Sequence, residues 1–248
     1  MSLAPDAVVR SEVSRPRELL GALLDATPHR ARIMWTAAIG VGLVVVFGLV
    51  IRSSHFDFAV VQFLNGFHHG AVGSLTSAVY KVFGPGPAIV GTVVLTGIIV
   101  ALTRNLRVAS TFAATIGATW LSSAIVKLTV DRPRPDASLL SFPYHPAQID
   151  ASYPSGHTVF VTALVVTIVL GLAAGRARWL AGIIGGLLIV GVGTALVIDG
   201  VHSPSDVAAS IVWGVAVAPL ARMLWVSVVL RRLGVPRPRH SRDARLLQ

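Results

Sequence analysis

Cysteine is absent from the 248 residues of this chain, and only 13% of the residues are charged. The lack of cysteine excludes disulfide frameworks, thiol nucleophiles, iron–sulfur clusters and cysteine-ligated zinc. Soluble domains have roughly 25% charged residues, so this chain has too few charges to cover a soluble domain of its size. Lysine is scarce as well, at Lys81 and Lys127 only, so arginine supplies most of the positive charge.

Apolar residues make up 54% of the chain and gather in six runs. The runs cover about residues 33–51, 88–103, 108–129, 155–174, 179–198 and 204–230. A membrane-spanning helix needs about 20 apolar residues. The sequence therefore predicts an all-α polytopic membrane protein, with six transmembrane helices in one bundle over residues 33–230. Basic tails at residues 1–32 and 231–248 flank this domain, and we expect a short amphipathic helix near residues 72–83.

The net charge of +10 is distributed unevenly over the predicted topology. With six spans both tails share one side of the membrane, and that side carries 15 of the Lys and Arg residues against five on the other. Positive residues concentrate in cytoplasmic segments of membrane proteins. We therefore expect both termini in the cytoplasm, and we interpret the charge as a topology signal, not as a nucleic-acid-binding surface.

Three polar clusters fall on the side opposite the tails, each at the end of a predicted span. The first runs from Lys127 to Arg134-Pro135, the second is Pro154-Ser-Gly-His157, and the third contains His202 and Asp206. Since helix ends on one side of a bundle lie close together, the three clusters are expected to form one site facing outward.

The first two clusters have the chemistry of a phosphate site. Lys127, Arg132 and Arg134 supply three cations within eight residues, and arginine grips phosphate oxygens bidentately. Ser155 and Gly156 open a helix whose free N–H groups and dipole favour an anion. We expect these five residues to bind phosphate without a metal ion or other cofactor.

Two histidines add reactive groups to that phosphate site. Asp206 follows His202 by four residues, so its carboxylate can fix the imidazole tautomer and leave the other nitrogen free to attack phosphorus. His157 stands beside the predicted anion site and can protonate a leaving oxygen. Together these residues predict a phosphatase that works through a phosphohistidine intermediate.

Simpler interpretations of each cluster stay open. The cations of the first cluster are also typical of interfacial anchors that reach lipid headgroups. Ser203-Pro204-Ser205-Asp206 has the pattern of a helix N-cap followed by proline and an acid, so Asp206 has a capping role available. Ser155 has the same alternative. The co-occurrence of three complementary clusters on one side favours a functional site.

The three clusters resemble the motifs of the type 2 phosphatidic acid phosphatase superfamily, which also contains bacterial acid phosphatases and vanadium haloperoxidases. Lys127 to Arg134-Pro135 is similar to its first motif, residues 154–157 to its second, and His202 to Asp206 to half of its third. The resemblance implies the six-helix fold of the lipid phosphatase branch. It also implies His202 as nucleophile, Asp206 as its partner and His157 as general acid. The phosphate would be held by Lys127, Arg134, Ser155 and the N–H of Gly156.

One position departs from that pattern. Leu196 stands where the third motif has an arginine that binds phosphate. Losing a charge-assisted hydrogen bond of roughly 1.5–3 kcal/mol corresponds to a rate loss of about 10- to 150-fold.

We expect an enzyme of the bacterial plasma membrane that hydrolyses a lipid phosphate or diphosphate, with a polyprenyl diphosphate or phosphate favoured. The alternative is a catalytically silent protein of the same fold that binds or transports lipid phosphates. A haloperoxidase fits membrane embedding less well than a lipid phosphatase does.

Overall fold

The fold is described from a computed structural model, for residues 19–233. The described residues form helices and loops without a β-strand. The main helices are α1 (Arg30–Ile51), α2 (Phe58–Asn65), α3 (Gly70–Val82), α4 (Pro85–Thr103), α5 (Leu106–Val130), α6 (Gly156–Gly171), α7 (Arg176–Ile198) and α8 (Pro204–Leu224). Short elements are η2 (Gly21–Leu24), η3 (Ala137–Leu139), a π-helical turn (Trp225–Val229) and α9 (Leu230–Arg232). The predicted tails fall largely outside the described residues.

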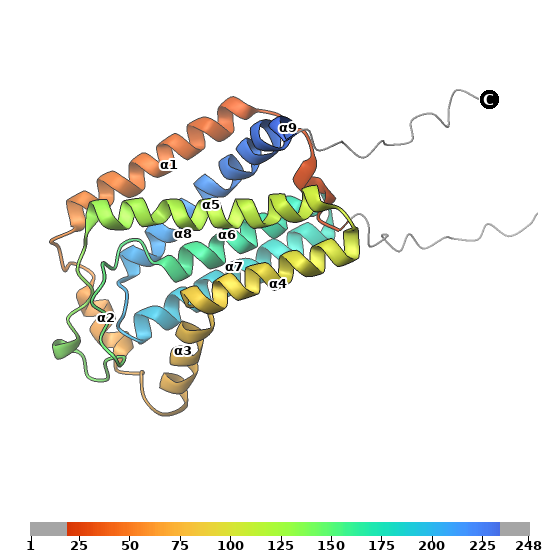
Figure 1. Ribbon diagram of the computed structural model, residues 1–248. Helices are drawn as coiled ribbons and strands as arrows, with labels where there is room; N and C mark the ends of the chain where they lie inside the picture. The colour runs from red at the N-terminus through yellow and green to blue at the C-terminus, as the bar shows by residue number, and fades with distance from the viewer. Residues whose placement is uncertain (1–18, 234–248) are drawn as a thin grey trace, which may run out of the picture.

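Each of the six apolar runs coincides with one long helix of the bundle (Figure 1). Five of these helices, α1, α4, α5, α7 and α8 with its extension, are long and apolar enough to cross a membrane. The remaining helix, α6, has 16 residues, which at about 1.5 Å per residue is roughly 24 Å. The predicted all-helical membrane fold is confirmed at this level.

Helix α6 lies at the centre of the bundle and packs against α5, α7 and α8 (Figure 1). Most of its residues are buried, including Val159, Phe160 and Val161. The helix is apolar on every side, as expected for a helix surrounded by others. The packing of α6 against its neighbours therefore fixes the position of its first residues. Those residues belong to the second polar motif.

The segment between α1 and α4 contains two short helices at one end of the bundle (Figure 1). The expected amphipathic helix corresponds to α3, which packs against α7. Helix α2 was not predicted, because its eight residues follow a mixed stretch without a long apolar run. The long loop between α5 and α6 lies at the same end (Figure 1).

At the opposite end, η2 packs against α5 and α6 (Figure 1). The buried guanidinium of Arg222 donates to the carbonyls of Ala22, Leu23 and Asp25 at 2.9, 2.9 and 2.8 Å. These bonds hold the first described residues against α8. The two ends of the described chain therefore lie together, away from α2, α3 and the polar loop.

Candidate active site

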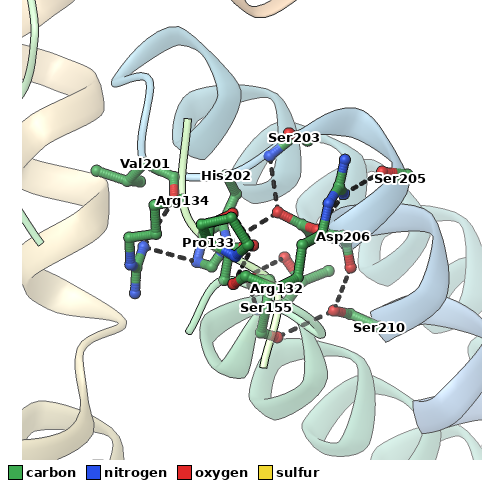
Figure 2. Close-up of polar contacts among 12 residues, drawn as sticks. Arg132, Pro133, Arg134, Ser155, Val201, His202, Ser203, Ser205, Asp206 and Ser210 are labelled. Carbon is green, nitrogen blue, oxygen red and sulfur yellow. Dashed lines mark hydrogen bonds and ion pairs between the residues drawn. The ribbon is translucent and has the colours of Figure 1, made fainter. Parts of the chain in front are cut away.

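The three polar motifs come together at one end of the bundle, between the end of α5, the start of α6 and the loop from α7 to α8 (Figure 2). Asp131 ends α5 with a left-handed backbone, φ 48°, which turns the chain directly into Arg132 and Arg134. The amide of Ser155 lies 3.5 Å from the carbonyl oxygen of Asp206, which joins the second motif to the third. The predicted convergence of the motifs is what the structure shows.

His202 lies at the centre of this cluster and is almost fully buried. Its Nδ1 faces Oδ2 of Asp206 at 3.5 Å, and its Nε2 lies 3.4 Å from Nη1 of Arg134. Burial, together with the charge of Arg134, lowers the pKa of His202 to about 4. At neutral pH the imidazole is therefore uncharged, with Nδ1 toward the carboxylate and Nε2 available beside a cation.

Asp206 caps the start of α8 and also faces the imidazole of His202. Its Oδ2 accepts from the backbone N–H of Ser203 at 2.9 Å and completes a capping box at the start of α8. The same oxygen faces His202, while Oδ1 accepts from Arg132 at 2.7 Å. The capping bonds fix the carboxylate against the helix, so it presents a defined oxygen to the imidazole.

The sequence predicted that Arg132 binds phosphate, but in the structure its guanidinium contacts protein acceptors. Its guanidinium is 3% exposed and donates to Asp206, Asp57, the Ser205 hydroxyl and the Ser54 carbonyl. All these acceptors are within 3.2 Å. The donors of Arg132 therefore point to protein acceptors behind His202, including two carboxylates.

The other two cations, Lys127 and Arg134, share one carboxylate, that of Asp150. Lys127 Nζ lies 2.5 Å from Oδ2, and Arg134 donates from Nη2 and Nε to Oδ1 at 2.8 and 3.1 Å. Burial opposes ionisation of Asp150, but the hydrogen bond and charge of Lys127 and the charge of Arg134 lower its pKa to about 2. Lys127 and Arg134 therefore share one internal anion, the Asp150 carboxylate.

Ser155 and Gly156 start α6 as expected. Ser155 is fully buried, and its hydroxyl accepts from the N–H of Thr158 at 3.4 Å as the N-cap. The first N–H groups of a helix lack acceptors within the helix. The start of α6 therefore places such N–H groups next to the third motif.

His157 is positioned by α3, a helix that contains none of the three motifs. Its Nε2 lies 3.1 Å from the backbone carbonyl of Tyr80 in α3, and its ring stacks on the Tyr80 ring at 4.5 Å. The rings of His157 and His202 are 6.4 Å apart. Since the Tyr80 carbonyl accepts the Nε2 proton, Nδ1 is the nitrogen left for proton transfer.

A cavity of about 510 Å³ opens beside these groups, and Arg134, Tyr144, Gln148, Asp150 and Val201 are among its lining residues. Arg134 contacts both this cavity and His202, because its Nη1 donates to the Val201 carbonyl at 2.7 Å and lies beside Nε2 (Figure 2). The cavity therefore reaches Arg134, whose Nη1 lies beside Nε2 of His202.

Three residues of the site were missed from the sequence: Asp57, Tyr80 and Asp150. None lies in a motif, and each reaches its partner from a separate segment of the chain. Leu196, at the position of the expected arginine, is fully buried in the apolar core near Val201. Among the described residues, no group of three or more His, Cys, Asp or Glu side chains is placed to hold a metal ion.

Comparison with known proteins agrees with this geometry. Residues 107–229 match the family model of the PAP2 superfamily, and this match contains all three motifs. No curated protein matches the chain. The fold is similar to the crystal structure of a transmembrane PAP2 type phosphatidylglycerolphosphate phosphatase from Bacillus subtilis. That match has a TM-score of 0.61 and 18% identity, and covers 81% of this chain and 98% of the other. Motifs, site geometry and family match agree, and the chain belongs to the PAP2 superfamily.

Proposed function

We propose that this protein is a membrane phosphatase that hydrolyses a lipid phosphate or diphosphate through a phosphohistidine on His202. One observation carries the proposal. Nε2 of His202 lies beside the guanidinium of Arg134, while Asp206 faces the opposite nitrogen. Nucleophilic attack on a phosphate requires a neutral imidazole that a carboxylate orients at one nitrogen, with a cation beside the other nitrogen.

In the first step the substrate phosphate replaces the Asp150 carboxylate on Lys127 and Arg134. Nε2 of His202 attacks phosphorus, and the bond from phosphorus to the lipid alkoxide oxygen of a monophosphate, or to the bridging oxygen of a diphosphate, breaks. His157 enters this step protonated on both ring nitrogens. It donates its Nδ1 proton to the leaving lipid alkoxide, or to the leaving lipid monophosphate when the substrate is a diphosphate. The cations and the N–H groups at the start of α6 stabilise the charge on the transferring phosphoryl group.

In the second step water attacks phosphorus and the N–P bond breaks. His157 accepts the proton of that water, which returns it to the protonated state, and inorganic phosphate leaves. His202 is then neutral again with Asp206 behind it.

The apolar helices around the site support a lipid as the substrate. Polyprenyl diphosphates and phosphates remain our favoured class. The likeness to a phosphatidylglycerolphosphate phosphatase makes that lipid the second candidate. We infer that six helices cross the plasma membrane of a bacterium, with both termini in the cytoplasm and the site facing outward; the clustering of arginine on the tail side supports this orientation.

The alternative, a catalytically silent protein that binds lipid phosphates, is supported only by Leu196 at the position of the expected arginine. Arg134, Lys127 and both histidines remain in place, so the bond-making and proton-transfer groups are retained. These retained groups favour an enzyme.

The test is phosphate release by the purified protein in detergent, from polyprenyl diphosphate, polyprenyl phosphate, phosphatidylglycerol phosphate and phosphatidate. We expect release from at least one lipid and its loss in His202→Ala and His157→Ala. Release that continues in His202→Ala would overturn the phosphohistidine mechanism. Absence of release from every lipid, with release gained by Leu196→Arg, would establish the silent protein.

A further inference from the structure

We propose that Asp57 is a positioning residue for the reaction, and that its negative charge keeps the carboxylate of Asp206 effective as the partner of His202. The inference rests on the proposed function. Asp57 lies between α1 and α2, outside the three motifs and outside the residues that match the family model.

The contacts of Asp57 are buried and specific. The residue is 6% exposed. Its Oδ1 accepts from Nη2 of Arg132 at 3.0 Å, and its Oδ2 accepts from the backbone N–H and the hydroxyl of Ser205 at 2.9 and 2.6 Å. Ser205 and Asp206 are consecutive residues in the first turn of α8. Asp57 therefore contacts both the guanidinium that binds Asp206 and the helical turn that carries it.

The charges in this network explain why a second carboxylate is needed. Arg132 lies 2.7 Å from Asp206, and both are nearly inaccessible to solvent. At such a distance in a buried site, the guanidinium cancels most of the negative charge that Asp206 presents to His202. Asp57, on the other side of the same guanidinium, restores a net charge of minus one to the three groups.

That net charge matters when the N–P bond forms. His202 then becomes a phosphorylated imidazole that holds its Nδ1 proton against Asp206 and gains positive charge. A network with a net negative charge stabilises this species, and a neutral Arg132–Asp206 pair does not. Asp57 touches neither the substrate nor His202, so it acts only through Arg132 and Asp206.

Asp57 also supports the start of α8, so loss of activity in one variant does not separate the two roles. A double-mutant cycle does. Asp57→Asn leaves Arg132 opposite Asp206 alone, with no net charge. Arg132→Met leaves two carboxylates, and the double variant Asp57→Asn with Arg132→Met returns to one carboxylate, that of Asp206. The control is Asp136→Asn, because Asp136 is exposed in the loop between α5 and α6, where it hydrogen-bonds to Ser138.

The measurements are kcat and KM for lipid phosphate, the melting temperature, and exchange of ¹⁸O between inorganic phosphate and water. The exchange reports reversible formation of phosphohistidine without any lipid. We expect Asp57→Asn to lower kcat and exchange on the order of 10- to 100-fold with little change in KM. Without Arg132, the two buried carboxylates repel each other and one of them takes up a proton. In the Arg132→Met background the same substitution then leaves Asp206 as the charged group, and it is expected to raise both rates.

This reversal of sign is the signature of the charge role. If Asp57→Asn lowers the rates in both backgrounds, Asp57 only supports the fold and the inference is overturned. Wild-type rates in Asp57→Asn would also overturn it, with the proposed function intact. A wild-type protein that neither releases phosphate from lipids nor exchanges oxygen would instead overturn the proposed function. If Asp57→Asn melts too low for assay, the comparison of Arg132→Met with the double variant gives the same decision.

Discussion

At the scale of single residues, Lys127 and Arg134 hold the Asp150 carboxylate. In the proposed mechanism the substrate phosphate therefore displaces an internal anion. The Asp150 side chain is 56% exposed, and exposed ion pairs contribute about 0.2–1 kcal/mol. The competition is therefore modest, and substrate can overcome it.

Asp150→Asn should lower KM for lipid phosphate by roughly two- to fivefold, which corresponds to removing such a pair. Steady-state kinetics with Asp136→Asn as the matched control checks this. An increase in KM would show that Asp150 organises the cations for substrate and does not compete with it.

His202 makes folding stability depend on pH. Its pKa is about 4 in the folded protein and 6.5 as a free side chain. Between these values the unfolded chain binds the extra proton, so stability falls as the pH falls from about 6.5 to about 4. The melting temperature of the wild type should drop more over this interval than that of His202→Ala. Parallel curves for the two proteins would contradict the buried neutral imidazole.

The convergence of the three motifs could be predicted from the sequence, because each motif is local and helix ends on one side of a bundle meet. The supporting partners could not. Arg132 and Asp57 are 75 residues apart, and only the folded bundle brings them together. The carboxylates behind Arg132 determine the direction of its guanidinium, and the local motif did not indicate them.

At the scale of helices, α1 supports the second motif. Gly48 allows Tyr153 to approach, and the Tyr153 hydroxyl donates to the carbonyl of Val44 at 2.7 Å. A Cβ atom on Gly48 would lie 2.5 Å from Cε1 of Tyr153 and 2.8 Å from Cγ2 of Val130. Tyr153 directly precedes Pro154-Ser155, so the packing of α1 positions the start of α6.

Gly48→Val should therefore destabilise the protein by about 1–3 kcal/mol, as overpacking does, and reduce activity by displacing the motif. Gly42→Val is the matched control in the same helix, because a Cβ there meets no atom within 4 Å. Thermal unfolding in detergent compares the two variants. Equal melting temperatures would contradict the close packing of α1 on Tyr153.

The apolar runs predicted the long helices well, because a membrane span leaves a strong compositional signal. Helix α2 has no such signal and was missed. Helix α6 is shorter than the predicted run, which was set at residues 155–174, because Ser155 caps it and its last helical residue is Gly171. The position of α3 against His157 also depends on tertiary packing, which composition does not encode.

At the scale of the whole molecule, the active site and the two described chain ends lie at opposite ends of the bundle (Figure 1). The absence of cysteine makes the orientation simple to measure. Ser138→Cys and Ala174→Cys place single thiols on exposed residues at the two ends. In intact bacterial cells a membrane-impermeant maleimide should label Cys at position 138 and reach position 174 only after permeabilisation. The reverse pattern would place the site in the cytoplasm.

The most direct test of the central claim is rapid-quench trapping of the phosphoenzyme from a lipid phosphate labelled with ³²P. The wild type should give an acid-labile, base-stable phosphohistidine on the peptide that contains His202, formed and lost at rates that account for turnover. His202→Ala should give no labelled protein and no phosphate release. Label on another residue, or turnover in His202→Ala, would contradict the account.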